Sequence, residues 1–384
     1  MKRHPNKLPT VLCVAPFNNP HIVPFYDEVS KLSDLDVTCV SLDPVTPIRL
    51  KLGWHEMDKD NGYLQPWRSF GDRIEYYKRL ITSDLVVFPG LFHSRTLPFH
   101  HAVRRFTFRP VVLWSEPLLN HPRSKNEGFW KRLARRIVLK PFNSQAYHLL
   151  AMGVGAETDY RTLGMSRWDY RQFHFSVRPH EYDNVVISPS TETRKLIYCG
   201  ALTHRKGVDL LIDAINEIKD IPLSLSILGD GPSRQELVQK VEKLGLTEQI
   251  EFLGSTDIEK SYEHMISHDL LVLPSRFDGW GAVVNEAMEC SLAVIVSDQV
   301  GSRRPLVESG TNGYVFKSES VADLRDKIVS IITERQTLDQ MKVASRDRIK
   351  KFSPSVTAEA FGDFCKHLVL GDEYQPNSET LRPA

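Results

Sequence analysis

The stretch SRFDGWGAVVNEAM, residues 275–288, decides the expected fold because short apolar runs flank it on both sides. Before it stands HDLLVLP (268–274), which is typical of a buried strand, and after it SLAVIVSD (291–298), a second β-branched run. The order strand, tight loop, helix, strand predicts a βαβ crossover in a parallel sheet. Ligands of such sheets bind at the carboxyl ends of the strands, where this loop would lie. Its two carboxylates, Asp278 and Glu286, are therefore the first candidate site residues.

The bulk composition limits the class of protein. At 384 residues the chain is too long for one ordinary hydrophobic core, so we expect two domains. A hydrophobic content of 41% and a charged content of 25% are typical of a soluble globular protein. The net charge of +1 argues against nucleic acid as a partner of the whole surface. No apolar segment approaches the roughly 18–20 residues that span a bilayer, so we expect a cytoplasmic protein, either free or peripheral at the inner face of the plasma membrane.

The cysteines and the amino-terminal segment agree with that location. The cysteines are odd in number, far apart and mostly inside apolar runs, which predicts a reducing compartment, no disulfides and no metal site. They are Cys13, Cys39, Cys199, Cys290 and Cys365. The early run TVLCVAP (10–16) is too short for a signal peptide and is better interpreted as the first strand.

Alternating strand and helix patterns run through both halves of the chain. In the first half, five strands are expected at 10–16, 36–42, 84–90, 110–116 and 147–153, with helices between them near 22–32, 72–81, 95–106, 127–139 and 156–163. The second half repeats the pattern, with strands at 195–202, 223–229, 249–254, 269–274, 292–298 and 313–316, and helices near 207–219, 233–244, 257–267, 281–290 and 320–334. Ser233 and Glu236 have the spacing of a capping box. The predicted fold class is α/β, with two Rossmann-like doubly wound domains facing each other across a cleft.

The expected domain boundaries follow from these patterns. The first domain covers 1–178, a polar, proline-bearing linker covers 179–192, and the second domain covers 193–350. A final amphipathic helix at 351–371 is expected to pack back on the first domain, and a polar tail at 372–384 is expected to be disordered.

A second group of candidate residues follows the first strand of the second domain, in CGALTHRKG (199–207). Arg205 and Lys206 directly precede a helix start, where their charges oppose the positive end of the helix dipole. A bound anion would make this arrangement favourable, because the helix amides and both cations would then point at a negative charge. This indicates a phosphate or diphosphate site, and the alternative is that both side chains extend into solvent.

The 275–288 stretch offers a matching helix start at the same edge of the sheet. Gly279 and Gly281 allow close backbone approach, and Ala282 and Val283 have backbone N–H groups in the first helical turn. A carboxylate such as Glu286 can accept both hydroxyls of a ribose, and the alternative is a solvated side chain. The corresponding alternative for Asp278 is a helix N-cap.

Together these motifs resemble the retaining glycosyltransferases of family 4, which have the GT-B fold. The matching segments are HRKG (204–207), DGWGAVVNE (278–286) in the place of the family's E-x7-E, and VGSRRPLVESGTNGYVF (300–316). The first acid is Asp278 here, one methylene shorter than the family's Glu. The resemblance covers most of 195–335, and the first half of the chain matches only in outline.

The resemblance implies a metal-independent hexosyltransferase without a cofactor, which retains the anomeric configuration and uses a UDP- or GDP-sugar as co-substrate. Arg205, Lys206, Asp278 and Glu286 would be its catalytic residues. LGDGP (228–232) and IEFLG (250–254) fall where relatives line the base pocket. The implied donor-binding residues are Gly200, Arg205, Lys206, Gly229, Phe252, Leu253, Asp278, Gly279, Trp280, Gly281, Ala282, Val283 and Glu286.

The acceptor is expected to bind to the first domain, as a glycan or a lipid-linked molecule of surface polysaccharide or glycolipid biosynthesis. Strand-end positions in this acceptor-side domain give as candidates Asn18, Asn19, His21, His93 and Glu116, each with an ordinary loop residue as the alternative. Two other functions stay open: a sugar-nucleotide epimerase or phosphorylase of the same fold, and a non-catalytic partner that binds nucleotide-sugar for another transferase.

A basic amphipathic helix is predicted in GFWKRLARRIVLK (128–140). Its apolar side is Trp130, Leu133, Ala134, Ile137 and Val138, and its basic side is Lys131, Arg132, Arg135, Arg136 and Lys140. One interpretation is an interfacial helix on an anionic membrane surface. The other is a helix that packs its apolar side on its own sheet and leaves the basic side in solvent.

Overall fold

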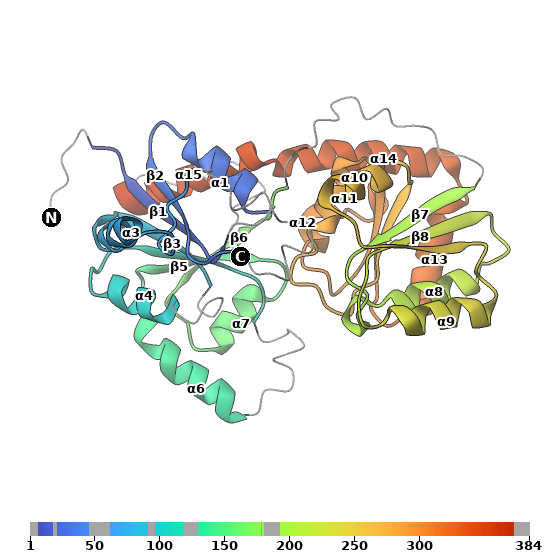
Figure 1. Ribbon diagram of the computed structural model, residues 1–384, viewed down its shortest axis with the longest axis horizontal. Helices are drawn as coiled ribbons and strands as arrows, with labels where there is room; N and C mark the ends of the chain where they lie inside the picture. Colours follow the sequence, from blue (N-terminus) through green and yellow to red (C-terminus); the bar gives the residue numbers. More distant parts are fainter. Residues whose placement is uncertain are drawn as a thin grey trace. The chain divides into compact units, whose positions relative to one another are not determined.

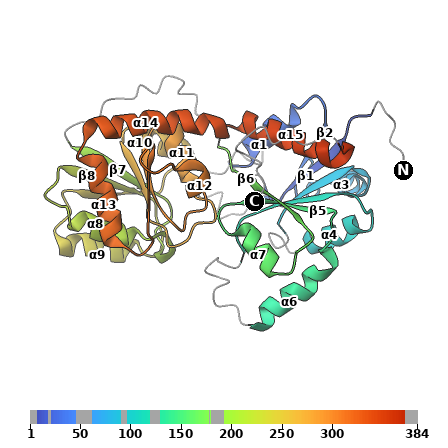
Figure 2. The same ribbon diagram turned by 180° about the vertical axis from the view of Figure 1, so that it is seen from behind.

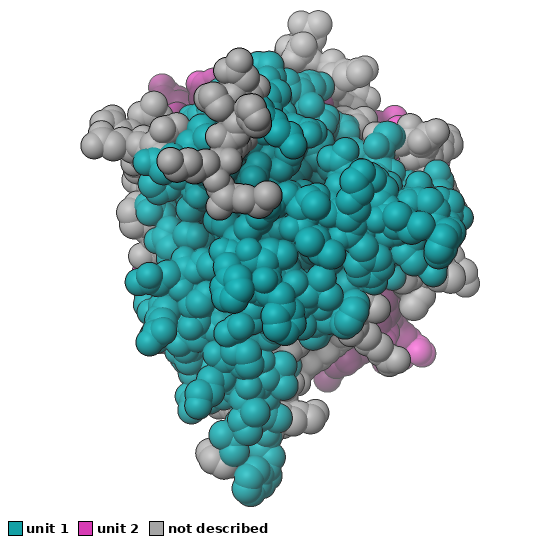
Figure 3. Space-filling view, turned by 90° about the vertical axis from the view of Figure 1, so that its left-hand side faces the viewer, with its two compact units in different colours: residues 1–178, 352–384 teal, residues 179–351 magenta. Residues whose placement is uncertain are grey.

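A computed structural model of the chain describes residues 7–17, 21–45, 62–90, 97–118, 129–177, 179 and 193–371. The chain forms two compact units, one of residues 1–178 with 352–384 and one of residues 179–351, shown in different colours in Figure 3. Each unit has its own six-stranded sheet, and each is described by itself below.

All six strands of the first unit are parallel, in the order β2-β1-β3-β4-β5-β6. The strands are β1 (Thr10–Ala15), β2 (Asp36–Ser41), β3 (Leu85–Pro89), β4 (Val111–Ser115), β5 (Tyr147–Met152) and β6 (Asp169–Phe173). The central strands β3 and β4 are buried along their whole length, as expected for a sheet covered on both faces.

Helices cover both faces of this sheet (Figures 1 and 2). They are α1 (Val23–Ser30), α3 (Phe70–Thr82), α4 (Leu97–Arg105), α6 (Phe129–Leu139) with the 3₁₀ turn η2 (Lys140–Phe142), α7 (Ala156–Thr162) and α15 (Pro354–Leu370). The last helix returns from the far end of the chain and packs against α1. There Phe361 meets Phe25 with ring centroids 5.3 Å apart, and Gly362 leaves room for Leu32.

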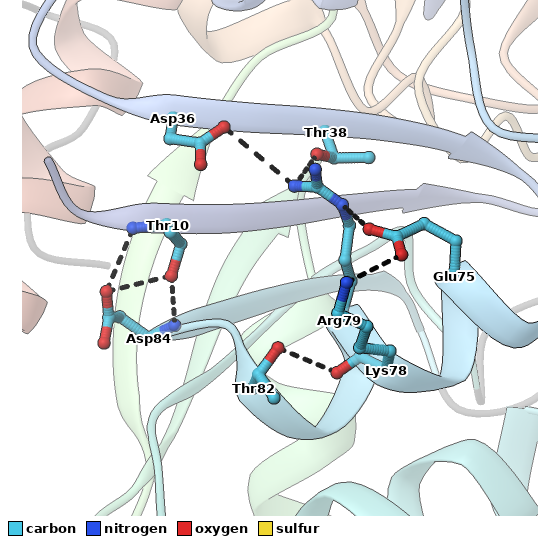
Figure 4. Close-up of polar contacts among 8 residues, drawn as sticks. All are labelled: Thr10, Asp36, Thr38, Glu75, Lys78, Arg79, Thr82 and Asp84. Atoms are coloured by element: carbon cyan, nitrogen blue, oxygen red, sulfur yellow. Dashed lines mark hydrogen bonds and ion pairs between the residues drawn. The ribbon is translucent and has the colours of Figure 1, made fainter.

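An aspartate placed just before a strand ties the centre of each sheet together. Asp84 accepts hydrogen bonds from the backbone N–H and the hydroxyl of Thr10, at 3.0 and 2.9 Å, which fixes the start of β1 beside β3 (Figure 4). In the second unit Asp269 accepts from the backbone N–H of Lys195 at 3.0 Å. Its other carboxylate oxygen accepts from the buried Lys342 at 3.0 Å. The Asp84–Thr10 and Asp269–Lys195 hydrogen bonds each join the two strands between which the strand order of their sheet reverses.

The sheet of the second unit is parallel too, in the order β12-β11-β10-β7-β8-β9. Its strands are β7 (Arg194–Cys199), β8 (Leu223–Leu228), β9 (Ile250–Gly254), β10 (Leu270–Leu273), β11 (Ala293–Ser297) and β12 (Gly313–Phe316). From β7 the chain first builds outward to β8 and β9, then returns to the other side of β7 for β10 to β12. The order therefore reverses between β7 and β10, the point where doubly wound sheets open a binding crevice.

The helices of the second unit lie in two layers on the two faces of its sheet (Figure 1). They are η3 (His204–Lys206), α8 (Val208–Asn216), α9 (Arg234–Leu244), α10 (Ile258–Ile266), α11 (Val283–Glu289), α12 (Arg303–Leu306), α13 (Val321–Ile332) and α14 (Arg335–Ile349), followed by η4 (Lys350–Phe352). Within the described part of the chain, no helix combines the length and apolarity that a bilayer crossing requires.

The predicted fold class, two Rossmann-like doubly wound domains, is confirmed by these two sheets, whereas three local predictions were incomplete or wrong. Strand β6 and helix α14 were not anticipated, because neither carries a strong apolar period. The capping box is wrong: Ser233 precedes α9 but makes no side-chain cap bond, because its backbone is already helical, with φ −86° and ψ −4°. The expected linker and tail lie almost wholly outside the described residues.

The second interpretation of the basic helix is also wrong for the residues that the structure describes. Trp130, Ile137 and Val138 of α6 do not pack on the sheet, since they are 77%, 64% and 49% exposed. Arg136, from the basic side, donates two hydrogen bonds to the carbonyl of Thr162, at 3.1 and 2.8 Å. These three side chains of the apolar stripe therefore face solvent, while Leu133 is partly buried.

Candidate functional site

The two loops singled out by the sequence meet where the strand order reverses in the second unit. The 204–207 turn follows β7, and the 275–282 loop follows β10, the adjacent strand. Lys206 Nζ lies 2.6 Å from Asp278 Oδ2, and both side chains are 13% exposed. Arg205 lies 3.7 Å from the other oxygen of Asp278 and donates to the carbonyl of Phe277 at 2.7 Å. Two cations and one carboxylate thus form a compact cluster at the carboxyl edge of the sheet.

Asp278 is not the helix cap that the sequence left open as an alternative. Helix α11 begins after Ala282, and no side chain caps it. The backbone of Asp278 is held instead by the loop after β11, with its N–H donating to Gln299 at 3.0 Å and its carbonyl accepting from Gly301 at 3.0 Å. The Asp278 carboxylate is therefore directed by its ion pair with Lys206.

Arg276 fixes the two loops to each other, and the sequence reasoning missed it. Its guanidinium donates two parallel hydrogen bonds of 2.7 Å to Asp209 in the first turn of α8, a third of 2.8 Å to the carbonyl of His204, and a fourth of 2.7 Å to Glu319. Hydrogen bonding to Asp209 raises the pKa of Arg276, so it stays charged. The sequence contained only a weak signal for this role, namely Arg276 in one loop and Asp209, four residues after Arg205, next to the other loop.

Two glycines let the loops approach as closely as they do. Gly207 has φ +69°, and a Cβ on it would lie 2.1 Å from the carbonyl oxygen of Pro274. Gly229, after β8, has φ +145°, and a Cβ there would lie 1.9 Å from the carbonyl oxygen of Gly200. Any side chain at either position would push neighbouring strand-end loops apart.

Glu286 lies on α11, partly buried next to this cluster. Burial raises the pKa of Glu286 to about 7, and the nearby positive charge of Lys206 offsets only part of that effect. Burial, and after it the charge of Glu286, raises the pKa values of Cys199, at the end of β7, and of Tyr262. A poorly hydrated carboxylate whose pKa is close to neutral pH is typical of a binding or catalytic position.

The remaining donor-binding candidates take up different roles in the fold. Trp280 is only 2% exposed, and its indole N–H donates to Asn285 at 2.8 Å, so the side chain is part of the core under the loop. Gly279, Gly281 and Ala282 form the backbone that leads into α11, and Val283 is the first residue of that helix. Gly200 follows β7 beside Lys206. Phe252 and Leu253 lie on the edge strand β9, partly buried, and Arg234 stands 5.9 Å above the Phe252 ring.

The acceptor-side candidates belong to the first unit, and the structure describes only two of them. His21 follows β1 and Glu116 follows β4, and both side chains are partly buried. Asn18, Asn19 and His93 lie outside the described residues. Among the residues that are described, no group of three or more His, Cys, Asp or Glu side chains has the arrangement of a metal site.

Comparison with known proteins agrees with this geometry. The profile of the family "Glycosyl transferases group 1" matches residues 183–348, which contain both loops and Glu286. The glycosyltransferase MJ1178 of Methanocaldococcus jannaschii is 34% identical over 157 residues, 41% of this chain and 43% of the relative. The sulfoquinovosyl transferase SQD2 of Arabidopsis thaliana is 25% identical over 221 residues, 57% of this chain and 42% of the relative. The chain thus spans less than half the length of these curated relatives.

Similarity of fold extends over nearly the whole chain. The structure of Anabaena Alr3699/HepE in complex with UDP superposes with a TM-score of 0.67, covering 93% of this chain and 99% of that one at 16% sequence identity. Identity at that level shows the fold, while the match to the family profile is confined to residues 183–348 of the second unit. Residues 183–348 thus match the group 1 glycosyltransferase family, and the chain has the two Rossmann-like domains of the GT-B fold.

Proposed function

We propose that this protein transfers a hexosyl group from a UDP- or GDP-sugar to a glycan or lipid-linked acceptor with retention of anomeric configuration, in the synthesis of a surface polysaccharide or glycolipid. The observation that carries the proposal is the cluster of Arg205, Lys206 and Asp278 where the strand order reverses, with Glu286 beside it. The family match of residues 183–348 supports the reaction class, and the cluster supports the division of roles among its residues.

Arg205 and Lys206 would bind the donor diphosphate. Lys206 is paired with Asp278 at 2.6 Å, so a diphosphate would join this ion pair and share the ammonium group. As the glycosidic bond breaks, negative charge grows on the leaving diphosphate, and both cations stabilise that charge in the transition state. This supply of positive charge is the reason to propose transfer without a metal ion, which full activity in the presence of EDTA would support.

Asp278 and Glu286 would bind hydroxyl groups of the donor. The ion pair with Lys206 would keep the Asp278 carboxylate beside the diphosphate, to which the transferred sugar is attached in the donor. Glu286 lies down the helix and would accept the ribose hydroxyls. Because hydroxyl groups donate best to an ionised carboxylate, donor binding would draw Glu286 toward its ionised form.

The test is a thermal-shift screen of UDP, GDP and their sugar conjugates with the purified full chain, followed by product analysis. A ligand that binds only the folded state raises the melting temperature by mass action. A solved neighbour holds UDP, which makes UDP the first probe. We expect a glycoside product and slow donor hydrolysis. An epimerised nucleotide-sugar or a sugar phosphate would identify the epimerase or phosphorylase alternative, and binding without any turnover would identify a non-catalytic partner.

A further inference from the structure

We propose that α4, the turn after it and α6 form one membrane-contact surface, which inserts aromatic side chains into a bilayer containing anionic lipid. We call residues 97–109 together with 129–142 the aromatic-basic surface. This inference concerns only the first unit and does not depend on the donor site.

The three most exposed large apolar side chains of the described residues, Phe108, Phe106 and Trp130, lie on this part of the chain, and Phe70 at the start of α3 follows at 74%. Phe106 is 78% exposed, Phe108 is 85% exposed and Trp130 is 77% exposed, and Phe99 and Ile137 reach 59% and 64%. In the second unit, by contrast, Val343 is the single exposed large hydrophobic side chain among the described residues, at 46%. Clustered exposed aromatic side chains mark a surface that is covered in the working state of a protein.

The two helices are held together as one surface. Arg105, at the end of α4, donates a hydrogen bond to the carbonyl of Pro141 in η2, which continues α6. The His101 ring of α4 meets the Phe142 ring of η2, with centroids 6.0 Å apart. Helix α6 lies beyond α4 at the margin of the unit (Figures 1 and 2), and it forms the projection at the lower end of the space-filling view in Figure 3.

The turn that presents Phe106 and Phe108 is anchored by hydrogen bonds and holds a strained residue. Below it the buried Arg104 donates to the carbonyls of Leu80, Ser83, Asp84 and Pro110, at 2.8 to 3.3 Å. Phe108 itself has φ +53°, in the left-handed region that a bulky residue disfavours. Folding would favour glycine or asparagine at this position, and solubility would not favour phenylalanine. A phenylalanine held outward there therefore points to a function in contact with an apolar medium.

Charge decides between a membrane and other apolar partners. Residues 97–109 contain three arginines and residues 129–142 contain five basic residues, and neither segment contains an acidic residue. The whole chain has a net charge of only +1, so this excess is local. Aromatic side chains flanked by cations, on a projecting helix, match the interface of a bilayer with anionic headgroups. Trp130 and Ile137 lie two turns apart, about 10 Å, on a face that can lie parallel to such a surface.

The test uses flotation of the full chain with vesicles of phosphatidylcholine alone or with 30% phosphatidylglycerol, as our choice of probe, at low and high salt. We expect binding to the anionic vesicles, weakened by salt. The double variant Trp130→Ser/Phe108→Gly should lower the partition coefficient at least about tenfold. Arg136→Gln/Lys140→Gln should lower it by roughly fivefold per charge removed. Val343→Ser is the matched control in the other unit, and it should bind like the wild type.

Two further measurements separate insertion from other outcomes. Brominated lipid should quench part of the tryptophan fluorescence of the wild type, and Trp130→Phe should lose that component while still floating. Phe108→Gly alone should keep or raise the melting temperature, so weaker flotation cannot be ascribed to unfolding. The proposal is overturned if the wild type binds no vesicles at low salt, or if Trp130→Ser/Phe108→Gly binds as well as the wild type. It is also overturned if the wild type self-associates without binding vesicles and Trp130→Ser/Phe108→Gly abolishes that self-association.

Discussion

The raised pKa of Glu286 leads to a specific prediction: replacing this residue with glutamine stabilises the ligand-free protein, and the gain grows with pH. Burial raises the pKa of Glu286 from 4.5 to about 7. Below pH 4.5 the carboxyl group is protonated in both the folded and the unfolded state, so it has no effect on stability. Between pH 4.5 and about 7 the unfolded state releases its proton while the folded state keeps it, so stability falls as the pH rises.

The magnitude follows from the size of the shift. A shift of one pKa unit corresponds to about 1.4 kcal/mol, so the full shift would cost the folded state about 3 kcal/mol above pH 7. The side chain is only partly buried, and water can relax around it, so we expect about 1–2 kcal/mol. For a unit of this size, that free energy corresponds to an increase of about 2–8 °C in melting temperature.

The assay is differential scanning fluorimetry of wild type and Glu286→Gln from pH 5 to pH 9. The quantity to compare is the change with pH of the difference between the two proteins, because any constant packing effect of the amide cancels. Glu236→Gln, at an exposed position of α9 in the same unit, is the control and should show no such trend. A difference that stays constant from pH 5 to pH 9 would refute the inference that Glu286 is desolvated in the folded state.

Glu286→Gln should stabilise the protein but weaken its binding of UDP. If Glu286 binds the ribose, the wild type should bind UDP more tightly as the pH rises through about 7. Glu286→Gln should bind UDP weakly at every pH, since ribose is common to nucleotide and donor. Equal UDP affinity for the two proteins at pH 8 would argue against the ribose-binding role while leaving the stability prediction intact.

The other residues of the site give further predictions. Lys206→Ala should weaken UDP binding by about 1.5–3 kcal/mol in calorimetry, and unchanged affinity would remove the phosphate assignment. Asp278→Asn should not weaken UDP binding, because it releases Lys206 from its ion pair, yet turnover should fall roughly 10- to 100-fold. Arg276→Lys loses the paired bonds to Asp209 and should lower unfolding free energy by about 2 kcal/mol, with a raised KM for the donor. Gly229→Ala should destabilise the protein by more than about 3 kcal/mol in denaturant titration, whereas Gly245→Ala, which also has a positive φ but open space around it, should cost only about 1–2 kcal/mol.

The sequence by itself determined most of the strands and helices in both units and the two loops of the site. Apolar runs such as HDLLVLP and SLAVIVSD are local signals, and their spacing leaves few alternatives to a parallel sheet. Parallel strands all end at one edge, so Arg205, Lys206 and Asp278 could be assigned to the same edge without coordinates. Elements with weaker local periodicity, such as β6 and α14, could not be recognised in the same way.

Only the tertiary structure decided how those residues interact. Lys206 and Asp278 stand 72 positions apart and form a direct ion pair, which the sequence could place at one edge but not in contact. The depth of Glu286, the burial of Trp280 and the bonds of Arg276 likewise depend on neighbours from several strand-end loops. The amphipathic pattern of α6 is the same whether its apolar stripe faces the sheet or the solvent. Which of the two occurs depends on the space that the rest of the unit leaves for the helix, because periodicity defines a face but packing decides what that face contacts.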